Sequence, residues 1–145
     1  MASAGKKGRG VFALTAMAEG ELVTKYSGVA RWVWDIPAHL WQHCFQVGFD
    51  RYVLPRRGSP GWYVNHSCDP NCLIRGAREV VTRRPIRRGE ELTIDYSTNV
   101  GWEGYSLSCA CGARNCRRIV TSYGHLNAKL KREYGNKVSR FLLKG

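Results

Sequence analysis

The sequence predicts a single, mainly β domain of 145 residues, with short helices near its C-terminus. Stretches rich in β-branched and aromatic residues recur about every ten residues, and turn residues separate them. Apolar residues at helical spacing appear only near the C-terminus. A chain of this length is expected to form one domain with its own hydrophobic core.

The first 54 residues are expected to hold two strands and a hairpin. Residues 6–13 form a glycine-bearing loop that runs into a short apolar strand, and residues 22–26 form a second strand. Apolar residues alternate with polar or small ones over residues 44–54, which predicts a β-hairpin. The intervening residues 29–41 have mixed character, and their tryptophans are expected to cover a small core.

The middle of the chain is expected to alternate between loops and short strands. Residues 55–61 form a loop that leads through residues 62–64 into a polar run at residues 65–72. Short strands follow near residues 73–74, 79–82 and 91–96, with turns between them.

The C-terminal part changes to helical character. Leu126, Leu130 and Tyr134 recur at helical spacing, and Gly135 is a residue type that commonly ends a helix. Apolar residues within 138–142 predict one further helical turn.

The chain is strongly basic. It has 23 Lys and Arg against 11 Asp and Glu, a formal net charge of +12. Such a charge favours acidic partners such as nucleic acid, with Arg83, Arg84, Arg87 and Arg88 as a candidate patch, although solubility alone would also explain it. Neither a helix-turn-helix nor an aromatic RNA-reading motif is evident, which weakens the interpretation as a nucleic-acid-binding protein. We expect no membrane partner, because no apolar run approaches the ~18 residues of a membrane span.

Three cysteines close together indicate a metal site. Cys109, Cys111 and Cys116 fall within eight residues, as metal ligands often do. No apolar stretch follows the basic pair at residues 6–7, so we expect no secretory signal and favour thiolates over disulfides. A structural zinc site needs four ligands, and the fourth must come from a distance. The candidates for it are Cys44, Cys68, Cys72 and the histidines.

The run Asn65 to Cys72 combines an amide, an imidazole, a hydroxyl and two thiols. In the simpler interpretation, its polar side chains only shape a loop and its cysteines fill the core. If Cys68 completed the zinc site, it would staple the C-terminal part against this run and build a pocket between them.

Four motifs together resemble the SET-domain protein lysine methyltransferases. They are KGRGVF at residues 7–12, YVNHSC at 63–68, GEELTIDY at 89–96 and the cysteine cluster at 109–116. The resemblance covers residues 6 to 117, and the short chain looks most like the compact microbial members.

The resemblance implies a fold of several small β-sheets with a knot-like crossing. It divides the chain into a SET domain at 6–108, a zinc-binding post-SET segment at 109–120 and a C-terminal helical extension at 121–145. The family's usual first strand is expected to be short or missing, because only five residues precede Lys6.

The resemblance also implies two cofactors, S-adenosylmethionine and one structural zinc ion. Tyr96 matches the catalytic tyrosine and also contacts the cofactor. The remaining residues expected to bind S-adenosylmethionine are Lys7, Gly8, Arg9, Gly10, Asn65 and His66. The residues expected to bind zinc are Cys68, Cys109, Cys111 and Cys116. The residues expected to line the substrate channel are Tyr26, Trp41, Ile94, Trp102 and Tyr105. Residues 117–119 are expected to close over the cofactor.

By this resemblance, the chain is a lysine N-methyltransferase that acts on a protein, with chromatin and ribosomal proteins as candidate substrates. Ile94 stands where the family often has Phe or Tyr, which favours higher degrees of methylation. We expect an intracellular protein, either cytoplasmic or associated with chromatin or a nucleoid. The alternative is a non-catalytic, zinc-stabilised binding module associated with nucleic acid. Asn65, His66 and Tyr96 are all present, which argues against that alternative.

Overall fold

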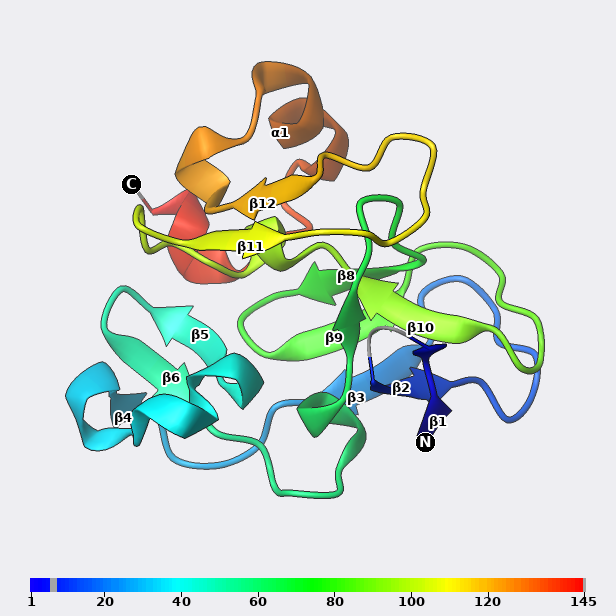
Figure 1. The fold of residues 1–145 in the computed structure, drawn as a ribbon, viewed down its shortest axis with the longest axis horizontal. Helices are drawn as coiled ribbons and strands as arrows, with labels where there is room; N and C mark the ends of the chain where they lie inside the picture. The colour runs from blue at the N-terminus through cyan, green and yellow to red at the C-terminus, as the bar shows by residue number, and fades with distance from the viewer. Residues whose placement is uncertain (6–7, 145) are drawn as a thin grey trace.

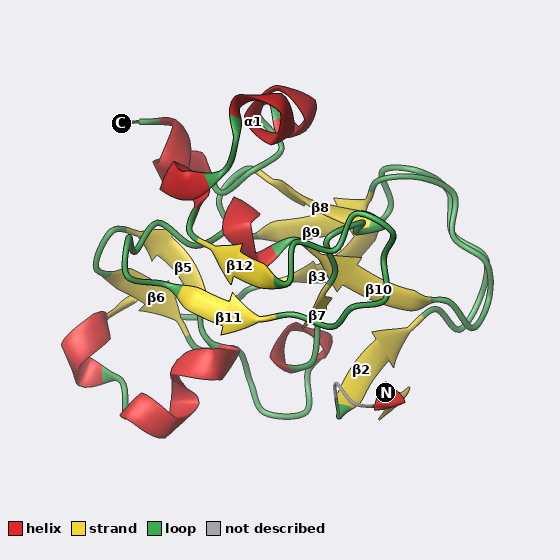
Figure 2. Ribbon diagram, turned by 45° about the horizontal axis from the view of Figure 1, so that its top comes forward, coloured by secondary structure: helices red, strands yellow, loops and turns green. Residues whose placement is uncertain are grey.

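Small β-sheets make up most of the fold, as Figures 1 and 2 show. The computed structural model describes residues 1–5 and 8–144. Within these residues the strands form one four-stranded, two three-stranded and one two-stranded sheet. The predicted mainly β fold is therefore confirmed.

The four-stranded sheet has the order β1-β2-β10-β7. Strand β2 (Arg9–Phe12) pairs antiparallel with both β1 (Ala2–Ser3) and β10 (Glu91–Ile94). Strand β7 (Asn65–His66) pairs parallel with β10, and His66 lies opposite Ile94. The polar run and the segment before Tyr96 are therefore neighbours, although about 30 residues separate them.

The two three-stranded sheets contain the predicted strands and hairpin. One has the order β3-β9-β8, with bounds Leu22–Lys25, Glu79–Thr82 and Cys72–Arg75. The other has the order β4-β6-β5, with bounds Arg31–Trp32, Arg51–Val53 and Phe45–Gly48. It lies to the left in Figure 1, apart from the four-stranded sheet.

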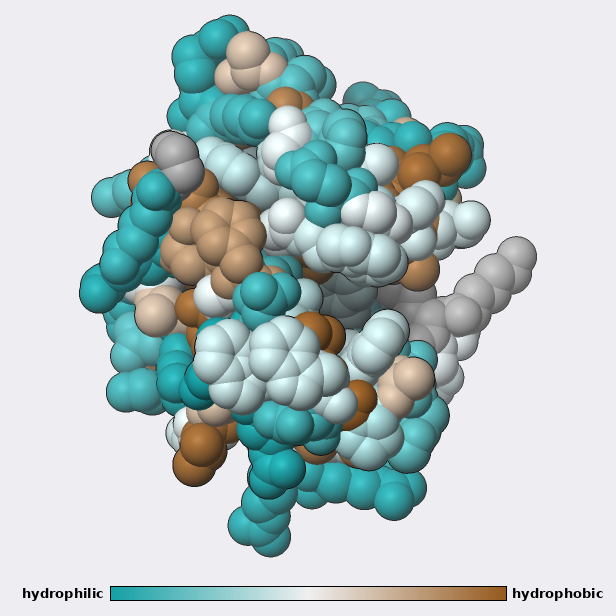
Figure 3. All heavy atoms as spheres, turned by 90° about the vertical axis from the view of Figure 1, so that its left-hand side faces the viewer, coloured by the Kyte–Doolittle hydropathy of each residue, from teal (hydrophilic) through white to brown (hydrophobic). Residues whose placement is uncertain are grey.

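Short 3-10 helices lie between the strands and after the last strand. They are η2 (Val33–Asp35), η3 (Ala38–His43), η4 (Pro60–Trp62), η5 (Tyr96–Thr98), η6 (Tyr123–His125) and η7 (Arg140–Leu143). The mixed segment before the hairpin is thus mostly helical turns. The prediction that its tryptophans cover a small core is wrong, because Trp32 and Trp41 are 43% and 51% exposed. Trp34 is 67% exposed and stacks on Trp32 with ring centroids 4.9 Å apart. On the face shown in Figure 3, hydrophobic residues are interspersed with hydrophilic ones and form no continuous apolar surface.

The two-stranded sheet joins β11 (Ser106–Ser108) to β12 (Ile119–Thr121). The sequence pattern did not predict it. It pairs the two ends of the cysteine-bearing loop. Strand β11 ends at the predicted boundary at residue 108 and β12 crosses the one at residue 120, and both boundaries remain predictions.

The C-terminal part folds back on the sheet of β8 and β9 (Figure 2). Helix α1 (Ala128–Tyr134) begins at Asn127, whose side chain accepts a hydrogen bond of 2.9 Å from the Leu130 amide. It ends at Gly135, whose φ of 54° is a conformation that glycine adopts without steric cost. Apolar side chains fix it in place: Leu73, Val81, Leu126, Tyr134 and Val138 form one buried cluster. No helix among the described residues is long and apolar enough to cross a membrane.

Candidate functional site

A cleft of roughly 720 Å³ lies between the sheets. Most of the predicted site residues line it: Arg9, Tyr26, Trp41, Asn65, His66, Ile94, Tyr96, Trp102, Tyr105, Cys109 and Cys111. Gly8, Gly10, Cys68 and Cys116 are not in its lining, and Lys7 lies outside the described residues. The cleft also has lining residues that the sequence did not single out: Phe45, Tyr52, Trp62 and Asn99. Of these, Phe45 lies in the predicted hairpin and Trp62 directly precedes the YVNHSC motif. Their positions next to these features were the only sequence indication that they line the cleft.

Tyr96 is the first residue of η5, which follows the end of β10 after one intervening residue. Its hydroxyl donates a hydrogen bond of 2.9 Å to the carbonyl of Val64. Burial, and to a lesser degree the charges of Tyr105 and Glu91, raise the pKa of the Tyr96 phenol far above its ordinary value. The phenol therefore keeps its proton at neutral pH and is a hydrogen-bond donor.

Aromatic rings form one wall of the cleft. Tyr26 stacks on Phe45 with ring centroids 3.9 Å apart, and His43 stacks on Trp62 at 4.1 Å. Burial raises the pKa of the Tyr105 phenol to about 12, with a smaller contribution from Asp95. An aromatic lining of this kind excludes water and can attract a cation.

The opposite end of the cleft is shaped by a close approach of β2 to β7. The Asn65 side-chain amide donates to the Arg9 carbonyl at 3.0 Å and to a Glu91 carboxylate oxygen at 2.9 Å. A Cβ at Gly10 would lie 2.7 Å from that oxygen and 3.1 Å from the Asn65 amide nitrogen, so only glycine fits without displacing them. Gly10 thus acts indirectly, by leaving room for Asn65.

The four predicted zinc ligands come together. The sulfurs of Cys68, Cys109, Cys111 and Cys116 all lie within 4.8 Å of one another. Cys68 Sγ is 3.9 Å from Cys109 Sγ, and Cys109 Sγ is 3.8 Å from Cys116 Sγ. In a zinc tetrahedron with Zn–S bonds of about 2.3 Å, the sulfurs are about 3.8 Å apart. The donor set and its spacing therefore fit one zinc ion, and of the remote candidates Cys68 is the one placed to complete the site.

Backbone amides donate hydrogen bonds to two of these sulfurs. The Cys68 amide donates to Cys111 Sγ, and the Arg117 amide donates to Cys68 Sγ, both at 3.4 Å. Burial opposes ionisation of Cys111, but amide donation from Cys68 and Ala113 and the adjacent thiols lower its pKa to about 6. Thiolate is the form that binds zinc.

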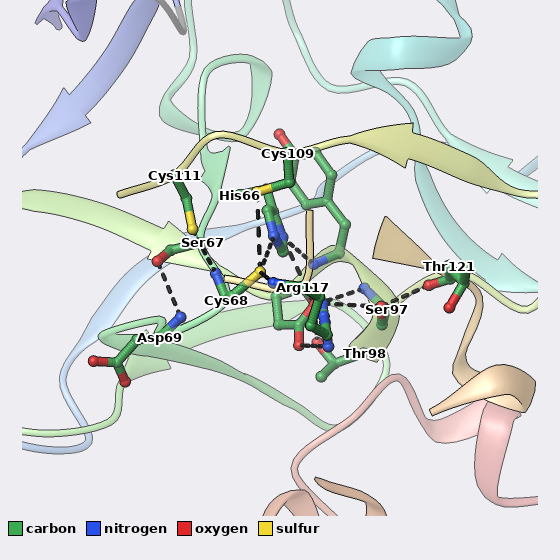
Figure 4. A network of polar contacts seen from close by, with 12 residues as sticks. His66, Ser67, Cys68, Asp69, Ser97, Thr98, Cys109, Cys111, Arg117 and Thr121 are labelled. Carbon is green, nitrogen blue, oxygen red and sulfur yellow. Dashed lines mark hydrogen bonds and ion pairs between the residues drawn. The ribbon is translucent and has the colours of Figure 1, made fainter. Parts of the chain in front are cut away.

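Cys68 is linked to Tyr96 through His66. The Tyr96 amide donates to His66 Nδ1 at 3.1 Å, which places the imidazole proton on Nε2. Nε2 lies 3.3 Å from Cys68 Sγ and donates to it, as Figure 4 shows. His66 thus supports a metal ligand with one ring nitrogen and the Tyr96 backbone with the other.

Arg117 does not line the cleft and points into the protein instead. Its guanidinium makes a two-pronged ion pair with Asp95, at 2.8 and 2.6 Å. At this residue, the segment expected to close over the cofactor therefore contacts Asp95, which directly precedes Tyr96.

Comparisons with known proteins agree with this geometry. A family described as "SET domain" matches residues 8–97. The chain is 34% identical to "Histone-lysine N-methyltransferase 2B" of Homo sapiens over 129 residues, which are 78% of this chain and 5% of that protein. It is 39% identical to "Histone-lysine N-methyltransferase trr" of Drosophila melanogaster over 84 residues, 52% of this chain and 4% of that protein.

A solved structure is similar in fold. It is titled "crystal structure of KRYPTONITE in complex with mCHG DNA and SAH", and it superposes with a TM-score of 0.65 at 25% identity over 81% of this chain. The chain spans 28% of that structure's length and 5% or less of the two curated relatives above. Since the family match extends over more than half of the residues and includes two of the four motifs in full and a third except for Lys7, the chain belongs to the SET-domain family.

Proposed function

We propose that this chain transfers methyl groups from S-adenosylmethionine to a lysine side chain of a protein. The observation that carries the proposal is a cleft lined by Tyr96, by aromatic rings and by Asn65. The four cysteines Cys68, Cys109, Cys111 and Cys116, here called the cysteine cage, border the same cleft through Cys109 and Cys111. The relatives named as histone-lysine methyltransferases and the similar structure titled with SAH support it.

The end of the cleft near Arg9, Asn65 and His66 is the expected cofactor site. When bound, S-adenosylmethionine supplies an electrophilic methyl group on a sulfonium. The chain's own task is to hold that group in line with the incoming nitrogen, because positioning accounts for much of the acceleration of a displacement reaction. Asn65 is held by two hydrogen bonds and His66 by contacts on both ring nitrogens, so this end of the cleft is preorganised.

The aromatic end of the cleft is the expected lysine channel. Desolvation between rings such as Tyr26, Phe45 and Trp62 disfavours the ammonium form and helps the lysine lose its proton. Tyr96 lines the same cleft, and we expect its hydroxyl to orient the neutral amine. The ring faces then stabilise the methylated ammonium product.

We expect the substrate to be a protein of chromatin. A second similar structure has a title that names an H3(1-15) peptide together with DNA, and the net charge of +12 here favours contact with nucleic acid. A basic enzyme repels a basic peptide in solution, whereas DNA attracts both. Methylation of a nucleosomal substrate should therefore fall more steeply with salt than methylation of the free peptide.

The test is transfer of labelled methyl groups by the zinc-loaded chain to histones and to a lysine-containing peptide. Tyr96→Phe should lower kcat by about 100-fold or more, as loss of one oriented hydrogen bond does in other active sites. Its affinity for S-adenosylmethionine, measured by calorimetry, should stay within about threefold of wild type. Wild-type chain that binds the cofactor but methylates nothing would favour the non-catalytic module instead.

The pH dependence separates an orienting phenol from a base. Because the raised pKa keeps Tyr96 protonated, the rise of the rate with pH should reflect only the substrate lysine. The Tyr96→Phe variant should then show the same pH profile at a lower rate. A rising limb that disappears in this variant would assign Tyr96 the role of base and contradict the mechanism.

A further inference from the structure

We infer that Tyr134, at the end of helix α1, is a positioning residue for the site, because it holds the carboxylate that locks the cysteine cage to the Tyr96 turn. The inference rests on the proposed function for its kinetic consequence and on the cage alone for its metal-release consequence. No catalytic motif includes Tyr134, and it lies 39 residues beyond Asp95.

Asp95 is the buried centre of the arrangement. Its side chain is 0% exposed, and Arg117 neutralises it through two hydrogen bonds. The Tyr134 hydroxyl donates to the same carboxylate at 2.8 Å, and the Ser97 amide donates at 3.1 Å. A buried carboxylate needs such partners, because an unpaired one is strongly unfavourable in the interior. Each oxygen is therefore fixed by at least two donors or cations.

The contacts close a ring through the cage. The Arg117 amide donates to Cys68 Sγ, and Cys68 Sγ contacts His66 Nε2. His66 Nδ1 accepts from the Tyr96 amide, and Tyr96 follows Asp95 directly in the chain. Figure 4 shows the His66, Cys68 and Arg117 part of this ring. A shift of the carboxylate therefore moves both a cage ligand and the backbone of the proposed catalytic tyrosine.

Tyr134 donates to Asp95 from outside this ring of contacts. It is 3% exposed, and its ring packs in the apolar cluster that anchors α1, beneath the guanidinium of Arg83 at 5.9 Å. Burial and the adjacent Asp95 raise the pKa of its phenol well above the ordinary value, so it stays a donor. Tyr134 is the last residue of α1, directly before Gly135. The packing of the helix therefore fixes the position of its hydroxyl.

The test uses Tyr134→Phe, which removes the hydroxyl and keeps the ring. The zinc-loaded variant should release zinc to a chromophoric chelator about tenfold faster than wild type at 25 °C, on the scale of other losses next to a metal ligand. Its kcat should fall about tenfold, while KM for the peptide and Kd for S-adenosylmethionine stay within about twofold. Arg117→Lys, which keeps the charge but not the two-pronged geometry, should shift both quantities in the same direction.

The matched control is Tyr123→Phe, because Tyr123 packs against the same apolar cluster without belonging to the ring. It should leave zinc release and kcat unchanged. A Tyr134→Phe variant with a lower melting temperature but wild-type zinc release and kcat would reduce Tyr134 to a structural residue and overturn the inference. If the wild-type chain methylates nothing, the proposed function fails while the zinc-release comparison still decides this inference.

Discussion

The sulfur of Cys68 lies 3.9 Å from the sulfur of Cys109, although 41 residues separate them in the sequence. The contact joins the part of the polar run that follows β7 to the loop between β11 and β12. Cys109 and Cys111 line the cleft while Cys68 lies behind it, so the cage holds one wall of the cleft in place.

Replacing Cys68 should therefore affect both metal and cleft. We expect Cys68→Ser to weaken zinc binding by more than about 100-fold, since losing a ligand costs more than losing a residue behind one. Binding of S-adenosylmethionine, measured by calorimetry, should be lost with the metal. Cys44→Ser is the control, because Cys44 is outside the cage and should leave one zinc per chain. A Cys68→Ser protein that retains zinc stoichiometrically would show that the cage has another fourth ligand.

The glycine at position 10 should matter for affinity more than for stability. In Gly10→Ala, the new Cβ would push away the Glu91 carboxylate and the Asn65 amide, both of which are movable side-chain ends. We expect S-adenosylmethionine to bind about tenfold more weakly, because Asn65 loses its fixed orientation. The melting temperature should change by only a few degrees. Unchanged affinity in this variant would mean that Asn65 does not help to hold the cofactor.

The sequence was sufficient for elements whose signal is local. The hairpin around residue 50 follows from alternation of apolar residues, and the end of α1 follows from a glycine that adopts a positive φ. Ligand arithmetic predicts a zinc site, since three close cysteines require a fourth ligand, and the resemblance to the SET-domain family selected Cys68 from the candidates. Each of these conclusions depends on a pattern within a few residues or on a known chemical requirement.

Polar contacts between residues far apart in the sequence have no such local pattern from which to predict them. Asp95 looks like one acidic residue in a strand, and Tyr134 looks like the apolar face of a helix. Their hydrogen bond exists because α1 packs on β8 and β9, which is decided by the buried cluster and not by either residue's neighbours. The β11–β12 pair was missed for a similar reason, because its three-residue strands are too short to show alternation.

Ile94 should set how many methyl groups are added. It is 3% exposed and lines the cleft, two residues before Tyr96. An aliphatic side chain there leaves room for a methylated amine and has no hydroxyl to hold water. Ile94→Tyr should shift the product towards monomethyl-lysine, as read by mass spectrometry of the peptide at full conversion. Ile94→Val is the control and should keep the wild-type distribution. A Tyr variant with the same distribution as wild type would remove Ile94 from this role.

The stability of the fold should depend on pH through Glu90. Its carboxylate accepts hydrogen bonds from the Arg84 guanidinium, from the Arg87 amide at 3.0 Å and from the Asn71 side chain at 3.3 Å. The Arg84 hydrogen bond is the main reason that its pKa is lowered to about 2. Asn71 in turn donates to the Glu91 carbonyl and accepts from the Thr93 amide, so Glu90 supports the contact between the polar run and β10.

The sign follows from linkage. The carboxylate loses its proton more readily in the folded chain than in the unfolded chain, so it stabilises the fold above a pH of about 4.5, and this contribution disappears as the pH falls towards 2. Glu90→Gln should lower the free energy of unfolding at pH 7 by roughly 1–2 kcal/mol, a value reduced for partial solvent exposure. Urea titrations of both proteins from pH 7 to pH 2 should show this difference shrinking to near zero. A difference that stays constant over that range would mean that Glu90 contributes by packing and not by charge.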